Sequence, residues 1–358
     1  MYKGRIKKPI DIIKQPWLDF ERLISLGIYK LMKRRKKTRS CSGNFKKILL
    51  VRRNRLGDAV NILPIIEGIK QCQPNMQIHV LANQYNAVVF EHSGAVDKVH
   101  VIDEKWLLGK LTLFMHPVLL QLRKEDFDLV IGVGGYSSVL AQLVFWVKGR
   151  YNVGPVSKKG TFYDLVFDLG VAESIGRDSK HHVDDMAYIV RQTRLNLPEK
   201  LPFTKLVRPR PACPGWLALC PDVKRKESRY PLSHYQQLVE ILLANHEVEK
   251  ILLFTESPDS EYRQLENFGA EWQATSNVED FIQSISVCQW AITAEGGGAH
   301  IAGALGLGLV VISGMGHQNY WRPYAERVRV LDVKNTVSQI PPEAVAAEFR
   351  ELKQTSPV

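Results

Sequence analysis

Residues 294–314 read AEGGGAHIAGALGLGLVVISG, and the order of residue types in this stretch decides the fold class. An apolar run ends at 295, three glycines follow, and small apolar residues predict a helix over 298–307. A second apolar run follows at 309–314. This strand–helix–strand order is typical of a parallel α/β sheet, because the helix returns the chain to the edge where the next strand begins.

The same alternation recurs on both sides of a proline-rich segment. Residues 197–215 contain five prolines, which is typical of a boundary between domains. Before it, the predicted strands are 47–53, 78–83, 99–103 and 128–134, and the predicted helices are 61–72, 106–124, 138–148 and 182–195. After it, the predicted strands are 216–221, 249–255, 290–295 and 309–314, and the predicted helices are 232–245, 258–267, 278–287, 298–307 and 341–353. We therefore predict two doubly wound α/β halves with a ligand-binding cleft between them.

The 358 residues suit two ordinary domains. The predicted division is a basic N-terminal extension at 1–44, a first domain at 45–197, a linker at 198–214, a second domain at 215–335 and a C-terminal helix at 336–358.

The positive charge of the chain is concentrated at its N-terminus. The formal net charge is +11, and residues 1–40 alone hold thirteen Lys and Arg against three Asp and Glu. Residues 17–37 predict an amphipathic helix with a basic end, which favours contact of residues 1–40 with an anionic membrane surface. Packing of this helix on the protein's own body is the alternative. Nucleic-acid binding is not expected, because no basic, aromatic-studded surface continues beyond the extension.

The five cysteines have neither CxxC nor metal-site spacing, so we expect free thiols in a reducing compartment and no metal site. The basic N-terminus lacks the features of a signal peptide. No run approaches the roughly 18 uncharged apolar residues of a membrane span. These features favour a cytoplasmic location.

The glycine run at 296–298 suits an anion at the start of a helix. Without side chains, an anion can approach the backbone N–H groups, and the helix dipole adds positive charge there. His300, in the first turn, can donate to a phosphate oxygen. The run is neither GxGxxG nor a P-loop. A tight turn with a packed histidine is the alternative interpretation.

Two further stretches follow the first strand of each half. RNRLGDAV (53–60) places Asp58 at a strand's carboxyl end, where its carboxylate can take a proton from an attacking hydroxyl or cap the next helix. In CPDVKRKESRYPLSHY (220–235), positive charge lies near a strand end, although a solvated loop explains such a run equally well. Its basic residues are Lys224, Arg225, Lys226 and Arg229.

Taken in order, these motifs resemble those of glycosyltransferase family 9, the heptosyltransferase family. The matching stretches are RLGDAVNILP at 55–64, SRYP at 228–231, EGGGAHIAGALG at 295–306 and SGMGHQNYWRPY at 313–324. HHVDDMAYIV at 181–190 is similar to the family's helix ahead of the linker. The resemblance covers roughly residues 46–335 and leaves out the first 40.

The resemblance implies a GT-B fold, in which two Rossmann-like, doubly wound parallel-sheet domains face each other across a cleft. It implies an inverting, metal-independent transfer of a heptose from ADP-heptose to a lipopolysaccharide inner-core or related glycan acceptor, with no cofactor. Asp58 would be the general base, with Arg55 and Gly57 on the acceptor side. The residues implied on the donor side are Glu295, Gly296, Gly297, Gly298, His300, Lys224, Lys226, Ser228 and Arg229.

Three positions depart from the family's motifs. Glu295 stands where the family usually has an Asp that touches the sugar, Ser228 stands where it has a Lys that meets the phosphates, and Asp222 follows Pro221 where it usually has a Gly. Two alternatives therefore stay open: a GT-B transferase with another nucleotide sugar, and a non-catalytic sugar-nucleotide-binding scaffold in glycan assembly. The leading hypothesis is a peripheral enzyme at the cytoplasmic face of the bacterial inner membrane, acting on a lipid-linked glycan acceptor.

Overall fold

The computed structural model describes residues 45–53, 55–103, 116–157, 162–172, 181–334 and 336–355, together with Gly27 and Gly43. The helix predicted at 17–37 and its membrane contact lie outside the described residues, apart from Gly27. The same is true of the first ten residues of the helix predicted at 106–124.

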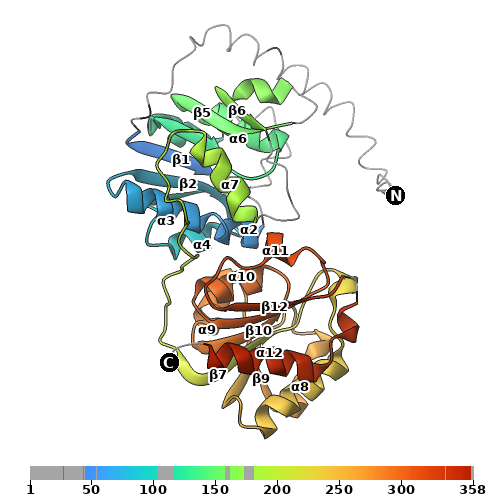
Figure 1. Cartoon of the computed structure of the whole chain (residues 1–358). Coiled ribbons are helices and arrows are strands. Elements are labelled where there is room, and N and C mark those ends of the chain that lie inside the picture. Colours follow the sequence, from blue (N-terminus) through green and yellow to red (C-terminus); the bar gives the residue numbers. More distant parts are fainter. Residues whose placement is uncertain are drawn as a thin grey trace.

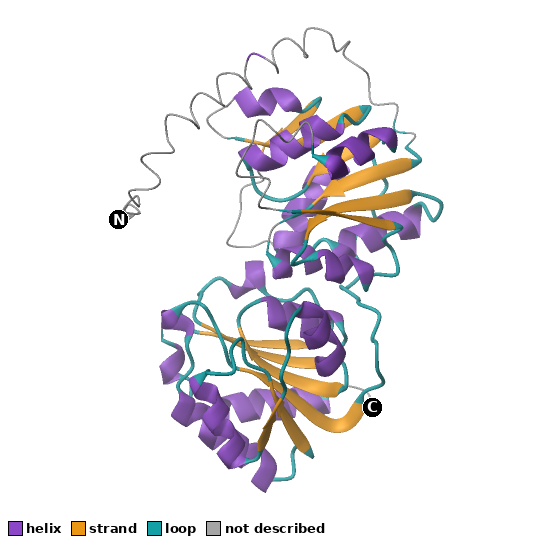
Figure 2. Cartoon of the chain, turned by 180° about the vertical axis from the view of Figure 1, so that it is seen from behind, coloured by secondary structure: helices purple, strands orange, loops and turns teal. Residues whose placement is uncertain are grey.

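The N-terminal domain is a six-stranded parallel sheet in the order β3-β2-β1-β4-β5-β6. Its strands are β1 (Lys47–Val51), β2 (Gln77–Asn83), β3 (Lys98–Ile102), β4 (Leu129–Gly132), β5 (Tyr151–Val156) and β6 (Leu169–Ala172). Its helices are α2 (Leu56–Val60), α3 (Leu63–Cys72), α4 (Ala87–Glu91), α5 (Pro117–Lys124), α6 (Ser138–Val147), the 3₁₀ helix η3 (Phe162–Val166) and α7 (His182–Arg191). Helices cover both faces of the sheet (Figure 2).

The C-terminal domain repeats this plan with a second six-stranded parallel sheet, in the order β12-β11-β10-β7-β8-β9. Its strands are β7 (Cys213–Cys220), β8 (Lys250–Leu253), β9 (Ala270–Trp272), β10 (Cys288–Ala294), β11 (Gly308–Ser313) and β12 (Val328–Asp332). Its helices are η4 (Lys226–Ser228), α8 (Leu232–Ala244), η5 (Glu261–Phe268), α9 (Val278–Ile285), α10 (Gly297–Ala304), α11 (Gln318–Trp321), η6 (Val337–Gln339) and α12 (Pro342–Gln354). The predicted fold class, two doubly wound parallel-sheet domains, is confirmed.

The structure also differs from the predicted elements in detail. The helix predicted over 61–72 is α3, and the short helix α2 before it was not predicted. Pro64 keeps the two helices apart, because proline lacks the N–H that a continuous helix would bond to the carbonyl of Val60. The helix predicted over 258–267 is the 3₁₀ helix η5. The sequence analysis missed four strands, β5, β6, β9 and β12. All four lie toward the outside of their sheets, where a weaker apolar pattern suffices.

The two domains meet at the carboxyl ends of their strands (Figure 1). Helix α2, which follows β1, packs against α10, which follows β10. A single buried apolar cluster includes Leu56 of α2 and Ala299 of α10. The segment before β7 also bridges the domains, because the Leu206 N–H donates to Ala304 O at 2.9 Å and the Val207 N–H donates to His92 O at 2.8 Å. The fold therefore brings the RLGD and GGGxH motifs into direct contact.

Candidate active site

The three glycines before His300 have different structural roles. Gly296 is the N-cap of α10 and has φ +152°, a conformation that side chains rarely adopt. A Cβ built at Gly297 would lie 3.0 Å from Cδ2 of Leu56, so this glycine permits the close approach of α2. At Gly298 a Cβ would make only ordinary contacts. The N-cap is a glycine and makes no side-chain capping hydrogen bond, so among the described residues no capping side chain competes with a ligand for the first N–H groups of α10.

His300 lies at the contact between the two domains. A Cβ built at Gly57 would lie 2.6 Å from Cδ2 of the His300 ring, so only glycine fits opposite it. Nδ1 of His300 is buried and has no hydrogen-bond partner among the described residues. Burial, aided by the charge of nearby His181, lowers the pKa of His300 to about 4. The imidazole is therefore neutral at physiological pH, and one of its nitrogens is left without a protein partner.

Asp58 faces the same contact from the N-terminal domain. Its Oδ1 lies 3.0 Å from Nη2 of Arg52 and 3.4 Å from Nε2 of His182. No hydrogen bond from a described residue is recorded to Oδ2, and the side chain keeps 18% of its surface exposed. Asp58 is not the cap of the following helix, since α2 begins at Leu56 and its N-cap is Arg55. The carboxylate therefore has one anchored oxygen and one open oxygen.

The electrostatics of Asp58 keep it ionised. Burial by itself would raise the pKa of the carboxyl group, but the hydrogen bond from His182 and the charge of Arg52 outweigh it and lower the pKa to about 2. Arg52 is itself buried, with Nη1 donating to Val133 O at 2.9 Å. A Cβ at Gly134, which has φ +117°, would lie only 1.8 Å from that same Nη1. Gly134 thus makes room for the guanidinium that holds Asp58.

The sequence analysis missed Arg52 and His182 as partners of Asp58. Arg52 directly follows β1, and His182 opens α7, 124 positions after Asp58 in the chain. The only signals were an arginine at a strand's carboxyl end and the HHVDD stretch, and neither indicates a contact with Asp58.

The donor-side residues fall into two groups. Ser228 and Glu295 are buried and hydrogen-bonded to each other, with Ser228 Oγ donating to Glu295 Oε1 at 3.0 Å. Ser313 Oγ donates to the other oxygen, Oε2, at 2.7 Å. By contrast, the loop cations are exposed on η4 and beside it. These are Lys224, Arg225, Lys226 and Arg229.

Comparison with known proteins identifies the family of this chain. The model of glycosyltransferase family 9 (heptosyltransferase) matches residues 115–340. The chain belongs to glycosyltransferase family 9. The matched region includes α10 and the 313–324 motif, whereas the RLGD motif with Asp58 lies before it. A comparison with curated protein sequences gave no match.

Solved structures share the fold of this family 9 glycosyltransferase at low sequence identity. E. coli heptosyltransferase WaaC with ADP superposes with a TM-score of 0.72 at 17% identity, covering 86% of this chain and 99% of that one. E. coli ADP-heptose lipopolysaccharide heptosyltransferase II gives 0.68 at 16%, with coverages of 87% and 100%. A family 9 glycosyltransferase from Veillonella parvula gives 0.71 at 16%, with coverages of 87% and 98%. These likenesses establish the GT-B fold.

In this family member the departures at Glu295 and Ser228 belong to one network. Glu295 follows β10, Ser313 ends β11, and Ser228 ends η4 after β7, so the carboxylate joins the ends of three adjacent strands. Its side chain, one methylene longer than Asp, reaches both hydroxyls. Both oxygens of Glu295 are therefore engaged by protein hydroxyls beside the glycine run.

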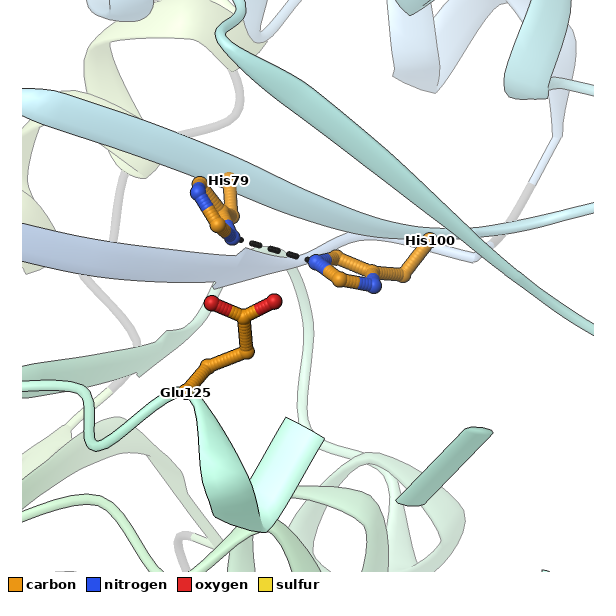
Figure 3. Close-up of side chains that lie close together, drawn as sticks. All are labelled: His79, His100 and Glu125. Carbon is orange, nitrogen blue, oxygen red and sulfur yellow. Dashed lines mark hydrogen bonds between the residues drawn. The ribbon is translucent and has the colours of Figure 1, made fainter. Parts of the chain in front are cut away.

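A second polar cluster in the N-terminal domain joins His79, His100 and Glu125 (Figure 3). Nδ1 of His79 lies 3.1 Å from Nε2 of His100, a hydrogen-bond distance, and both imidazoles are buried. The two oxygens of Glu125 accept from Lys47 and Lys98. These contacts engage one nitrogen of each imidazole and both oxygens of Glu125, and two ammonium groups beside the carboxylate oppose a divalent cation. We therefore assign the cluster a structural role.

Among the described residues, no helix combines the length and the apolar character that a membrane crossing requires.

Proposed function

We propose that this glycosyltransferase moves a heptose from ADP-heptose to a lipopolysaccharide inner-core or related glycan acceptor, with inversion at the anomeric carbon. The observation that carries the proposal is the position of the Asp58 carboxylate, which faces the N-terminal end of α10 across the domain contact. A base and an anion-binding helix on opposite sides of one cleft suit a single displacement, with the attacking hydroxyl on one side and the leaving diphosphate on the other.

In this mechanism the open Oδ2 of Asp58 accepts the proton of the acceptor hydroxyl as its oxygen bonds to the anomeric carbon. The hydroxyl becomes strongly acidic only as that bond forms, so a carboxylate with a pKa near 2 takes the proton late in the step. The anchored Oδ1 keeps the carboxylate oriented through Arg52 and His182. Arg55 and Gly57 would lie beside the acceptor.

The leaving ADP would be bound by the N–H groups at the start of α10, from Gly296 to Gly298. These donors are preorganised and need no metal to stabilise the developing charge. The unpartnered Nδ1 of His300 would offer a further hydrogen bond. Lys224, Lys226 and Arg229 are exposed and can extend toward the phosphates, whereas Ser228 would act through Glu295.

The proposed setting is the cytoplasmic face of the bacterial inner membrane, with a lipid-linked acceptor and residues 1–40 in contact with anionic lipid. The charge of those residues supports this setting. Their deletion should reduce binding to anionic vesicles while leaving ADP binding intact. Unchanged vesicle binding would contradict the docking role.

The function is tested by measuring ADP release and glycan product from ADP-heptose and an inner-core acceptor. Asp58→Asn should reduce turnover by on the order of 10²- to 10⁴-fold, because it removes the base while retaining the side-chain shape. Asp97→Asn, just before β3 and at the amino ends of the strands, is the matched control. Equal activity of Asp58→Asn and the wild type would refute the role of Asp58.

A transferase with a different nucleotide sugar is the second candidate, and the Glu295 network favours it. A carboxylate whose two oxygens accept from Ser228 and Ser313 has less capacity to bind a sugar hydroxyl. Calorimetric titration with ADP-heptose, ADP, UDP-sugars and GDP-sugars distinguishes the two. Donor binding without turnover on any acceptor would instead support a non-catalytic scaffold.

A further inference from the structure

Four residues of the C-terminal domain meet the start of α7 in the N-terminal domain, namely Tyr320, Trp321, Arg322 and Tyr324. The Tyr320 hydroxyl donates to Asp185 Oδ2 at 2.6 Å and lies 3.2 Å from Nδ1 of His182. Nε2 of His181 lies 2.8 Å from the carbonyl oxygen of Arg322 and donates to it. The ring of Trp321 lies against His182, with centroids 4.7 Å apart. This contact crosses the domain interface beside Asp58.

The hydrogen bonds fix where the protons lie. Tyr320 has a single hydroxyl proton, and an ionised Asp185 can only accept, so this proton is donated to Asp185. The Tyr320 oxygen must then accept from His182, and Nδ1 of that imidazole carries a proton. Nε2, the other nitrogen, lies 3.4 Å from Oδ1 of Asp58 and donates toward it, so both ring nitrogens carry protons in this arrangement. A hydroxyl from one domain thus fixes the protonation of Nδ1 and the ring orientation of an imidazole in the other.

We propose that Tyr320 is a positioning residue that couples closure of the two domains to the orientation of Asp58. This inference rests on the proposed function of Asp58 as the base. In the closed arrangement, a chain of contacts runs from Asp185 through Tyr320 and His182 to the carboxylate. When the domains separate, Tyr320 leaves, and the imidazole is released to rotate. The base is then correctly held only while the donor-binding domain is closed, which limits transfer of the sugar to water.

The charged and titratable groups around His182 come from both domains. They are Arg52, Asp58, His181, Asp185, His300 and Tyr320. Asp58 also has Arg52 as an anchor that closure does not bring in, since β1 and α2 lie in one domain. Loss of Tyr320 should therefore weaken catalysis without removing the charge of Asp58.

Tyr324 provides a matched control in the same segment. Its ring lies 5.0 Å from that of His181, and its hydroxyl donates to Leu201 O at 3.5 Å. It thus contributes an aromatic ring and a hydroxyl to the interdomain contact, but none of its contacts with described residues includes Asp58 or His182. Tyr320→Phe and Tyr324→Phe each remove one hydroxyl and preserve the ring.

The experiment compares both variants with the wild type in three measurements: the ¹⁵N shifts of the His182 ring by NMR with ADP bound, the Kd of ADP, and kcat against pH. Tyr320→Phe should change the His182 shifts and leave the Kd of ADP within about twofold of the wild-type value. It should lower kcat by about 10- to 100-fold and change the acid side of the profile of kcat against pH. Tyr324→Phe should leave the His182 shifts and kcat near their wild-type values.

Two results would overturn the inference. One is a set of His182 ¹⁵N shifts in Tyr320→Phe identical to those of the wild type, and the other is an equal fall in kcat in Tyr324→Phe. Failure of the proposed function has a different signature, namely wild-type protein that transfers no sugar. The NMR comparison still decides in that case whether Tyr320 sets the state of His182.

Discussion

Gly57→Ala tests whether the contact between α2 and α10 is needed for donor binding. In the structure the new Cβ would lie 2.6 Å from Cδ2 and 3.0 Å from Nε2 of His300. Carbon atoms in contact are normally about 3.5–4.0 Å apart, so one domain must move by roughly 1 Å. Overpacking of this kind costs about 1–3 kcal/mol, equivalent to about 5- to 150-fold in the closure equilibrium.

The substitution distinguishes an effect on the closure of the two domains from an effect on folding. Gly57 lies within α2 with no positive φ, and alanine is favoured over glycine in a helix by about 1 kcal/mol. The free energy of unfolding of the N-terminal domain should therefore not fall. We expect a weaker Kd for ADP, lower turnover and a larger radius of gyration with ADP by small-angle scattering.

Two variants serve as controls. Gly94→Ala, where a Cβ would meet nothing within 4 Å, should bind ADP like the wild type. In a His300→Ala background the clash is absent, so Gly57→Ala should then cost no more than about 0.5 kcal/mol. Wild-type binding by Gly57→Ala, or an undiminished cost in the His300→Ala background, would refute the reasoning.

Three other predictions concern the same region. The pKa values of His181 and His300 are lowered to about 4 by burial, from the ordinary 6.5, so both stabilise the fold as neutral groups above pH 6.5. The free energy of unfolding should therefore fall by up to about 3 kcal/mol for each group as the pH falls from about 6.5 to 4. Denaturant titrations at several pH values measure this, and a free energy of unfolding that does not change with pH would show that the assignment is wrong. Ser228→Ala removes one donor from buried Glu295 and should lower the free energy of unfolding by about 1–3 kcal/mol; an unchanged denaturation midpoint would show that the bond is weak. Gly296→Ala places a side chain at φ +152° and should weaken ADP binding through about 1–3 kcal/mol of strain, which calorimetry would detect; equal affinity would argue against anion binding at this turn.

The alternation of apolar runs and amphipathic segments was sufficient to predict two parallel-sheet domains. It succeeds because buried central strands such as β1, β10 and β11 require continuous apolar sequence. Outer strands carry a weaker pattern. β12 is half-buried throughout, and β9 has only three residues, so local sequence did not reveal them.

The sequence also predicted which motifs lie at the cleft, since parallel strands carry their following loops to one edge. That rule placed Asp58 and the glycine run at facing strand ends, and the structure brings α2 and α10 together. It did not predict what each residue contacts. Glu295 is bonded to Ser228 and Ser313 rather than open, and the loop cations are exposed.

The sequence by itself determined the two-domain α/β fold and the kinds of functional group at the cleft, namely a carboxylate, an imidazole and the backbone N–H groups of glycines. It could do so because hydrophobic periodicity and the positions of glycines are local properties. Only the tertiary structure decided that Arg52 and His182 hold Asp58, and that Tyr320 reaches His182 from the other domain. The contacts of His182 with Asp58 and with Tyr320 join segments more than a hundred residues apart. Charge and hydrogen-bond geometry act over a few ångströms, so they are fixed only when packing brings such segments together.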